Sequence, residues 1–542
     1  MPGLSVCKRP WWRSAVIYQI YPRSFADENG DGLGDLDGII TRLDYLADHL
    51  GVDAIWLSPF YPSPMADFGY DIADHCDVDP RFGDLATFDH LLAACQARAI
   101  KVIVDFVPNH TSDQHRWFVD AKSAKDSEHR GFYVWADPAD GGRPPNNWLS
   151  AFGGPAWTLD RSTGQYFLHS FLPEQPDLNW RNPAVKRAMF DVLRFWLDRG
   201  VDGFRIDVAH FVMKDPSLRD NPPAPTGKRE THRDRGAYDT QLHLHNRGHA
   251  DIHPLFRELR QLLESYTERD AKERLAVGEI HVFDWPRWIA YYGEQLDELH
   301  FPVNFGLLTA KWEAQAIRRQ VEELESALPE GAWPNYVLGN HDEPRLASRI
   351  GEKQARVAAM LLLTLRGTPT LYYGDELGMI DAVIPADRRR DPAGRDDPVL
   401  GRDPCRTPMP WDGGINAGFC PGEVEPWLPV GDENQKLHVA CQLADERSML
   451  ALYRQLLTLR RASDVLRLGS IETIDDGVPA ACFAYRRVLG ELSCVVALNF
   501  SDREQRLALT LPSEARVLLS TGLDRHGPLV PGKRFCSVPM KV

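Results

Sequence analysis

The chain has 542 residues, 43% hydrophobic and 26% charged, which is enough for a large core and two or three domains. Its formal net charge of −15 argues against nucleic acid or an anionic membrane surface as a partner, because both are polyanions. The nine cysteines are odd in number and form no CxxC or Cys/His cluster, which argues against a disulfide framework or a zinc site. With no signal-peptide core and no apolar stretch long enough to span a bilayer, we expect a cytoplasmic protein.

Eight short apolar runs, rich in β-forming residues, recur along the chain and alternate with helical patterns. This alternation is typical of an α/β fold, a closed parallel TIM (β/α)8 barrel, with an open doubly wound sheet as the alternative. The runs begin at Ala15, Ala54, Lys101, Gly203, Leu275, Glu298, Asn335 and Thr368.

Three segments interrupt the alternation. Residues 111–180, rich in Gly, Pro and Trp, predict a small inserted domain after the third strand, between barrel parts 1–110 and 181–463. The polar, Pro-rich stretch 209–250 follows the fourth strand and predicts a long loop over the site. Residues 464–542 read as antiparallel strands punctuated by Pro and Gly, which predicts a C-terminal β-sandwich.

Polar residues stand where several of these runs end, the end at which barrel enzymes form their active sites. A single charge there is most often part of a structural ion pair, but three acids, an arginine and two histidines on one rim indicate a site. They are His110 after the third run, Arg205 and Asp207 in the fourth, Glu279 after the fifth, and His341 and Asp342 after the seventh.

Three acids are what glycoside cleavage requires. One carboxylate attacks the anomeric carbon, a second delivers a proton to the leaving oxygen, and a third binds sugar hydroxyls and helps keep the acid protonated. Arg205 lies two residues from Asp207 on an extended strand, so it points to the same face and would keep Asp207 ionised. Neutral His110 and His341 would suit hydrogen bonds to hydroxyl groups.

The same residues carry a family resemblance. Four ordered strings resemble the sequence regions of glycoside hydrolase family 13, the α-amylase family, and QPDLN (175–179) resembles the marker of its oligo-1,6-glucosidase branch. The likeness covers nearly the whole chain. The four strings are DFVPNH from Asp105, GFRID from Gly203, GEI from Gly278 and GNHD from Gly339.

The resemblance implies a role for each matching residue. Asp207 would be the nucleophile, Glu279 the acid/base and Asp342 the transition-state stabiliser. Tyr70 would stack on the sugar ring, since an aromatic face packs well on sugar C–H groups. Pro410 replaces a glutamine that is usual in the family, which puts an amide contact there in doubt. The residues expected to hold the glucose are Asp67, Tyr70, His110, Arg205, His341 and Arg406.

A second motif runs from residue 27 to residue 35. Oxygen-bearing side chains at alternate positions, with glycine at the sixth, match the start of an EF-hand loop. Position twelve is Gly38 instead of glutamate, so a true EF-hand is not expected, and an acidic surface turn is the alternative. Because related glucosidases bind Ca²⁺ or Mg²⁺ in this loop, the resemblance implies a structural metal. Its expected ligands are Asp27, Asn29, Asp31, Leu33 through its carbonyl, and Asp35.

The sequence therefore favours a retaining, exo-acting α-glucosidase that acts on short sugars, as a monomer or homodimer. The substrate would be a small sugar, with possible transglucosylation. One alternative is a transferase or a sucrose or trehalose isomerase on the same scaffold. Another is a non-catalytic binding protein like the amino-acid-transporter heavy chains, although those carry a membrane anchor and this chain keeps all three acids.

Val208 follows the expected nucleophile and would line the floor of the pocket. In related enzymes valine here accompanies α-1,6 activity, whereas threonine accompanies a strict α-1,4 preference. Valine and threonine have nearly equal volume, but only threonine offers a hydroxyl to a second sugar. The resemblance thus predicts cleavage of isomaltose as well as maltose, unless Val208 only packs a barrel layer.

Overall fold

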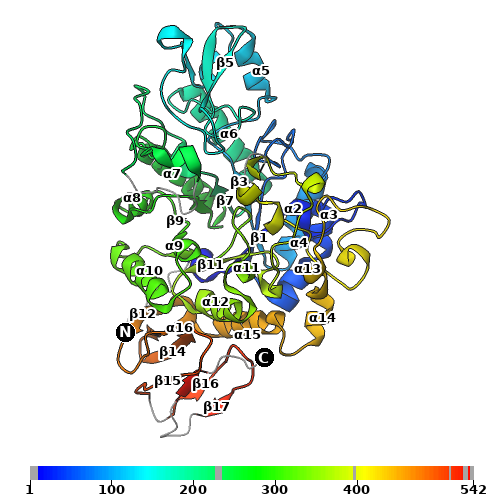
Figure 1. Ribbon diagram of the computed structural model, residues 1–542, viewed down its shortest axis with the longest axis vertical. Coiled ribbons are helices and arrows are strands. Elements are labelled where there is room, and N and C mark those ends of the chain that lie inside the picture. Colours follow the sequence, from blue (N-terminus) through cyan, green and yellow to red (C-terminus); the bar gives the residue numbers. More distant parts are fainter. Residues whose placement is uncertain (1–9, 226–234, 395–397, 512–513, 529–534, 538–542) are drawn as a thin grey trace.

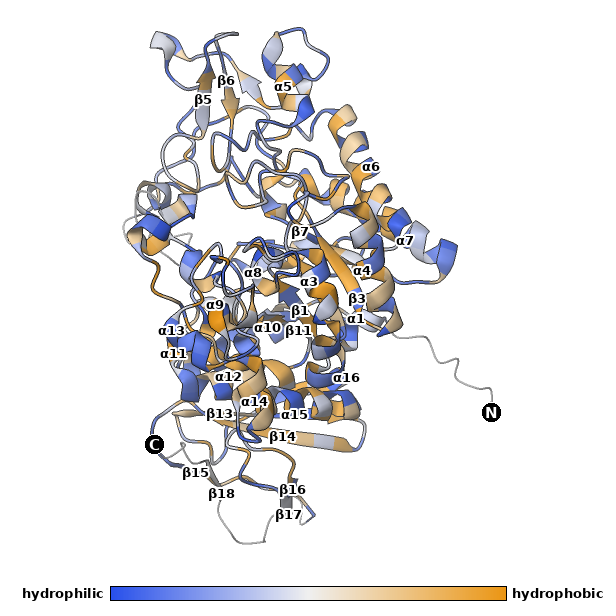
Figure 2. Cartoon of the chain, turned by 90° about the vertical axis from the view of Figure 1, so that its right-hand side faces the viewer, coloured by the Kyte–Doolittle hydropathy of each residue, from blue (hydrophilic) through white to orange (hydrophobic). Residues whose placement is uncertain are grey.

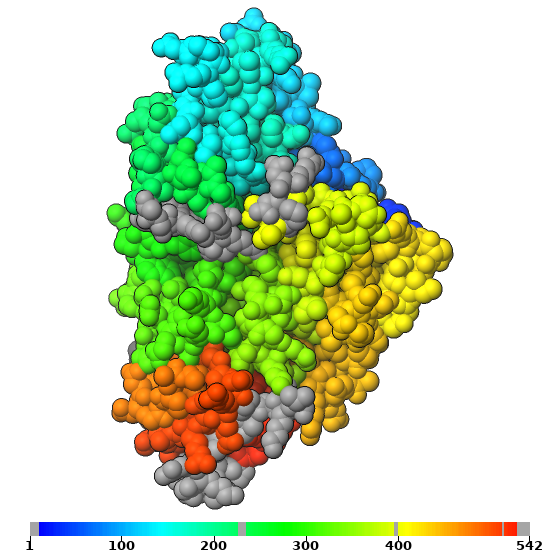
Figure 3. Space-filling model, viewed as in Figure 1, coloured from blue at the N-terminus to red at the C-terminus, as the bar shows by residue number. Residues whose placement is uncertain are grey.

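A computed structural model describes residues 10–225, 235–394, 398–511, 514–528 and 535–537. Figure 1 shows three parts from top to bottom: a small insertion, a barrel with its surrounding helices, and a set of C-terminal sheets. The insertion and the C-terminal part form opposite ends of the molecule's surface (Figure 3). No helix among these residues is both long and apolar enough to cross a membrane.

Eight parallel strands form the centre, in the order β10-β11-β1-β2-β3-β7-β8-β9. Each lies within one of the eight apolar runs, so the predicted barrel is confirmed. Neighbouring strands follow chain order without the reversal of a doubly wound sheet, which excludes that alternative. Their bounds are Ile17–Ile20 (β1), Ala54–Leu57 (β2), Lys101–Phe106 (β3), Gly203–Ile206 (β7), Leu275–Gly278 (β8), Phe301–Pro302 (β9), Asn335–Val337 (β10) and Thr368–Tyr372 (β11).

The barrel has a seam, a position at which two neighbouring strands are not joined by hydrogen bonds. Among the described strands, β9 pairs only with β8, and β10 pairs only with β11, so no ladder of hydrogen bonds joins β9 to β10. All residues of β1, β2, β7 and β8 are buried, as expected for strands that face the barrel interior on one side and helices on the other. Figure 2 shows β3 as an apolar strand at the centre of the molecule.

Helix α6 (Pro183–Arg199) illustrates how the sequence sets the surrounding layer. The Asn182 side chain caps its first turn by accepting from the Ala184 N–H, and Pro183 occupies a position where no N–H is needed. Gly200, with φ of 108°, ends it. The other long helices are α4 (Leu85–Ala97), α7 (Ile252–Asp270), α10 (Ala314–Ala327), α12 (Glu352–Thr364) and α15 (Met449–Ala462).

The insertion after β3 carries an antiparallel sheet of its own, in the order β4-β6-β5. Its strands are Trp135–Ala136 (β4), Trp157–Asp160 (β5) and Gln165–Leu168 (β6). Trp148, Trp157 and Tyr166 are buried in a small apolar cluster separate from the main core. A buried ion pair joins Lys214, after β7, to Asp177 at 2.7 Å, so the insertion is fixed to the barrel rim.

The C-terminal part is antiparallel, as the sequence predicted. A three-stranded sheet contains β12 (Ser470–Ile474), β13 (Cys482–Leu489) and β14 (Leu492–Asn499). The buried Arg487 donates to the carbonyls of Thr364 and Leu466, so it links this sheet to helix α12 and to α16 (Asp464–Leu468). Two smaller sheets pair β15 (Gln505–Leu507) with β18 (Phe535–Ser537), and β16 (Arg516–Val517) with β17 (Gly527–Pro528).

Candidate active site

Asp207 and Glu279 directly follow neighbouring strands and lie at the same height along the barrel axis. In the strand register Phe106 pairs with Ile206, and Ile206 pairs with Gly278. The next residue on each strand continues the ladder: the Asp207 N–H donates to the Phe106 carbonyl at 2.8 Å, and the Glu279 N–H donates to the Ile206 carbonyl at 2.9 Å. The register of three short strands therefore places two carboxylates side by side.

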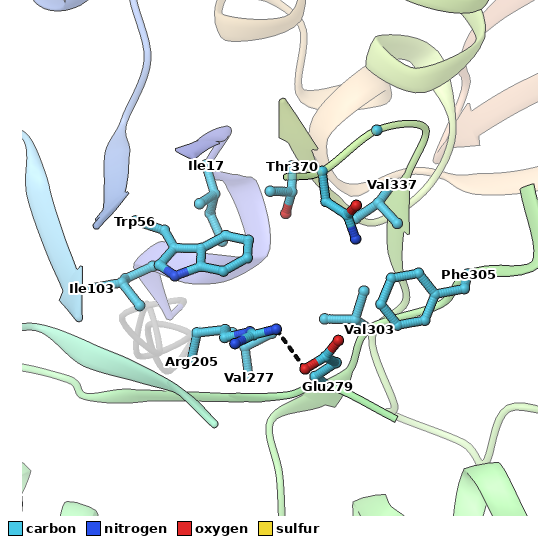
Figure 4. Close-up of a pocket in the computed structure, with 12 residues that line it drawn as sticks. Ile17, Trp56, Ile103, Arg205, Val277, Glu279, Val303, Phe305, Val337 and Thr370 are labelled. Atoms are coloured by element: carbon cyan, nitrogen blue, oxygen red, sulfur yellow. Dashed lines mark ion pairs between the residues drawn. The ribbon is translucent and has the colours of Figure 1, made fainter. Parts of the chain in front are cut away.

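One guanidinium bridges these acids. Arg205 Nη1 lies 2.8 Å from Asp105 Oδ1 and 2.6 Å from Asp207 Oδ1, and its Nη2 lies 2.5 Å from Glu279 Oε2. Figure 4 shows Arg205 and Glu279 facing each other beside Trp56, whose ring centroid lies 4.9 Å from the guanidinium carbon. All of these charged groups are buried, and the Arg205 guanidinium offsets the desolvation cost of the buried carboxylates.

The two central acids differ in pKa. Burial raises the pKa of Asp207 well above its ordinary value; Arg205 lowers it but does not offset burial together with the charges of Glu279 and Asp105. Burial also opposes charge at Glu279, but Arg205 and a hydrogen bond from His281 hold the pKa of Glu279 below its ordinary range. These directions are the reverse of the sequence expectation that Arg205 keeps Asp207 ionised and that the acid is protonated, because burial dominates at Asp207 while Arg205 and His281 favour charge at Glu279. Substrate must therefore change this balance before Glu279 can act as an acid.

Asp342 lies at the other side of the site between two arginines. Its Oδ1 is 2.9 Å from Arg406 Nη2 and 3.1 Å from Arg402 Nη1. Although burial opposes its charge, His341 and the two arginines lower the pKa of Asp342. Arg402 also reaches Asp67 Oδ1 at 2.7 Å, so it links the third acid to a residue expected to bind sugar.

The two histidines of the rim are neutral. Burial lowers the pKa of His110 to about 4 and that of His341 to about 3. The Tyr70 ring stacks on His341, with ring centroids 5.4 Å apart and an interplanar angle of 2°, and its hydroxyl donates to Asp105. Gln175, the first residue of QPDLN, lies 3.0 Å from His110 Nε2 and donates to Asp67 at 3.2 Å. This string therefore shapes the site directly.

These groups face a pocket of about 150 Å³ whose walls come from four parts of the chain. The strand ends supply the acids and histidines, and the insertion adds Phe152 and Phe171. The loop after β7 adds Phe211, Tyr238 and Arg247, and the segment before Arg402 completes the rim. The expected pocket residues found there are Asp67, Tyr70, His110, Asp207, Val208, Glu279, His341 and Asp342.

The arrangement agrees with the comparisons with known proteins. Residues 19–469 match the family model described as "Alpha amylase, catalytic domain", which is most of the chain. The chain belongs to the α-amylase family. A "Probable alpha-glucosidase" from Rhizobium meliloti (strain 1021) is 39% identical over 536 residues, which cover 96% of this chain and 95% of the relative. An "Oligo-1,6-glucosidase" from Parageobacillus thermoglucosidasius is 36% identical, covering 92% and 91%.

Solved structures of this family extend the comparison. The α-glucosyl transfer enzyme XgtA is 41% identical with a TM-score of 0.91, and 98% of each chain is covered. A mutant of the trehalulose synthase MutB is 33% identical with a TM-score of 0.86 and the same coverage. The chain is therefore an enzyme of the α-glucosidase and oligo-1,6-glucosidase branch of these glycoside hydrolases.

Within this α-amylase-family site, some residues differ from the sequence expectation. Arg406 is fully buried behind the pocket, where it donates to the His341 carbonyl at 2.7 Å and to Asp342. Arg402 lines the pocket instead, and the sequence reasoning missed it; the two arginines of RDPCR were the available signal. It also missed His281, two residues after Glu279, and the phenylalanines of the rim, which only the fold brings together.

The loop of residues 27–35 has a defined shape. Asp27 accepts from the N–H groups of Gly30 and Gly32 at 2.6 and 2.8 Å, and Asp35 accepts from Glu28 and Asn29. Gly32 has φ of 88°, and a Cβ there would lie 2.4 Å from a backbone oxygen of residue 425. A side chain at this position would therefore displace the loop.

The donor chemistry of this loop suits a hard cation. Burial raises the pKa of Asp27 and of Asp35; the charge of Asp31 adds to the first shift and that of Asp27 to the second. A cation would relieve this repulsion. The described residues contain no group of three or more His, Cys, Asp or Glu side chains arranged for a metal, so any cation here would also need Asn29 and the Leu33 carbonyl.

Proposed function

We propose that this enzyme is a retaining, exo-acting α-glucosidase that releases α-linked glucose from short oligosaccharides or glucosides. One observation carries the proposal: two buried carboxylates, Asp207 and Glu279, share the guanidinium of Arg205 at 2.6 and 2.5 Å. Both bind one guanidinium, which suits the close spacing of about 5–5.5 Å of retaining enzymes, where no water fits between nucleophile and sugar.

The reaction would run in two steps. In the first, an Asp207 oxygen bonds to the anomeric carbon while Glu279 passes a proton to the departing oxygen, which gives a covalent glucosyl-enzyme. In the second, Glu279 takes a proton from water as the water oxygen bonds to the same carbon and the Asp207 ester breaks. Arg205 compensates the charge on whichever acid is ionised, since it contacts both.

The exo preference follows from the closed end of the pocket. Arg402 bonds to Asp67 and Asp342, and its guanidinium lies 5.2 Å from the ring centre of Phe152 in the insertion. These contacts form a wall beyond the glucose site, where a longer chain would have to pass. The wall also presents charged groups to the hydroxyl at the non-reducing end, so a terminal glucose suits the site best.

Transglucosylation is the second candidate, because the mouth of the pocket is aromatic. Phe211 lies under the guanidinium of Arg247, with 5.6 Å from the guanidinium carbon to the ring centre, and Phe283 is 48% exposed. Such surfaces favour a sugar or another alcohol over water at the acceptor position. The likeness to a glucosyl transfer enzyme and to a trehalulose synthase keeps transfer and isomerisation as competing outcomes.

The loop of residues 27–35 is proposed to bind one structural Ca²⁺ or Mg²⁺ through the oxygens of Asp27, Asn29, Asp31, Leu33 and Asp35. The repulsion among its carboxylates supports this. The metal would stabilise the loop, and no step of the reaction involves it.

The test is product analysis by NMR. We expect maltose, isomaltose or p-nitrophenyl α-glucoside to give α-glucose first, with transfer products increasing at high sugar concentration. β-Glucose as the first product would contradict the mechanism. Sucrose converted mainly to an isomer, without net hydrolysis, would replace hydrolysis by isomerisation.

A further inference from the structure

The two carboxylate oxygens of Glu279 have different surroundings. Oε2 receives two donors, the Arg205 guanidinium at 2.5 Å and the Val208 N–H at 2.9 Å. Oε1 faces Nε2 of His281 at 2.9 Å. A protonated Oε2 would direct its hydrogen into a cation and an N–H group, so the proton of the acid must reside on Oε1.

The His281 ring is held in place. It stacks on Phe305 with centroids 4.2 Å apart and an interplanar angle of 9°, and the His210 ring lies 6.0 Å away. Its side chain is about three-quarters buried, and both His281 and Glu279 line the pocket. The stack fixes the direction of Nε2, and Nε2 then fixes the rotation of the Glu279 carboxyl group about its last bond.

The contacts of Oε2 tie that oxygen to the Arg205 guanidinium and to the backbone of Val208. Below the carboxylate lies a cavity of about 20 Å³ lined mainly by apolar residues, including Val277, Val303 and Phe305 (Figure 4). Among the described residues, His281 is the one hydrogen-bond partner of Oε1.

We propose that His281 is a positioning residue for the acid/base. Its Nε2 holds Oε1 of Glu279 toward the leaving-group side of the pocket and stabilises the carboxylate that forms there. The proton passes from Oε1 to the glycosidic oxygen as the bond from that oxygen to the anomeric carbon breaks and the Asp207 oxygen bonds to the carbon. This inference rests on the proposed acid/base function of Glu279.

The experiment separates two properties of His281. His281→Phe keeps an aromatic ring against Phe305 but removes the hydrogen bond, whereas His281→Gln keeps a donor near the position of Nε2 and removes the stack. Each variant is assayed on maltose and isomaltose, whose leaving groups need a proton, and on α-glucosyl fluoride, whose leaving group needs little acid help. Glu279→Gln serves as the reference for loss of the acid.

We expect His281→Phe to lower kcat/KM, which reports formation of the glucosyl-enzyme, roughly 10- to 100-fold on the disaccharides, with less than about threefold loss of kcat/KM on the fluoride. His281→Gln should recover most of the rate.

An equal loss on all substrates, or no loss in His281→Phe, overturns the inference. If Glu279→Gln shows the selective loss and His281→Phe does not, the inference fails while the proposed function stands. If Glu279→Gln shows no selective loss, the proposed function fails, and the inference with it.

Discussion

Two acidic clusters in this molecule are stabilised in different ways. In the active site, Asp105, Asp207 and Glu279 are buried around the Arg205 guanidinium. In the loop of residues 27–35, the carboxylates accept from backbone N–H groups, and no lysine or arginine among the described residues forms an ion pair with Asp27, Asp31 or Asp35. A cluster that contains its own cation can redistribute protons, whereas one that has only N–H donors favours an external cation.

Replacing the nucleophile tests the first half of this comparison and should have the largest effect. We expect Asp207→Asn to lower kcat by about 10⁴-fold or more, because the covalent intermediate can no longer form. Its melting temperature should change little, since Arg205 keeps Asp105 and Glu279 as partners. Asp31→Ala in the loop is the matched control and should keep more than half of the activity. A well-folded Asp207→Asn enzyme with a near-native rate would disprove the assignment.

Removing the internal cation should destabilise the fold. Arg205→Met leaves Asp105, Asp207 and Glu279 buried without compensation, at a cost of about 3–5 kcal/mol in the free energy of unfolding measured with urea. The pH dependence should also change. Burial raises the pKa of Asp105 from 3.8 to about 6, so its contribution to stability is complete below pH 3.8 and is lost as pH rises through 6.

Without Arg205 this loss should extend to higher pH, because the guanidinium is what lowers the pKa of Asp105 against burial. The variant should therefore lose more stability than wild type between pH 6 and 8. Parallel pH profiles of unfolding for the two proteins would show that Arg205 does not compensate Asp105.

Chelation tests the second half of the comparison. A cation that binds only the native state stabilises it by about 2.7 kcal/mol at a concentration 100 times its Kd. EDTA should therefore lower the melting temperature of wild type, and added Ca²⁺ should restore it. Asp31→Ala should melt like the chelated enzyme with or without Ca²⁺, whereas substitution of the exposed Asp37 by Asn should leave the response intact. A wild-type melting temperature that neither EDTA nor Ca²⁺ changes would refute the metal site.

The smallest effect is expected at Val208, between the two acids. Val208 has φ of 33°, a left-handed conformation that is rare for a β-branched residue, and its N–H bonds to Glu279. Threonine is also β-branched, so Val208→Thr leaves this strain unchanged and isolates the added hydroxyl. We expect the ratio of maltose to isomaltose kcat/KM to rise by up to about tenfold, the equivalent of one hydrogen bond. An unchanged ratio would assign linkage preference to the loop after β7.

The sequence predicted the barrel and its central acids because both depend on local patterns. Apolar runs mark the strands, and residues such as Asp207 and Glu279 directly follow them. The outer wall of the pocket was harder to predict, since Phe152, Phe211 and Arg402 come from segments with no periodic pattern. Arg402 and Arg406 are four residues apart, and only packing decides that Arg402 lines the pocket while Arg406 supports Asp342 from behind.

The seam between β9 and β10 has a consequence for how the barrel fluctuates. Val303 and Val337, in or beside these strands, line the small cavity inside the barrel, to which residues in or next to all eight strands contribute, and no ladder of hydrogen bonds joins β9 to β10 among the described residues. Amide protons that face the seam should therefore exchange with solvent deuterium through local opening, well before those shared by β2 and β3, which require disruption of the whole sheet. Because Asp342 follows β10, slow local opening at this seam would move the third acid relative to the other two.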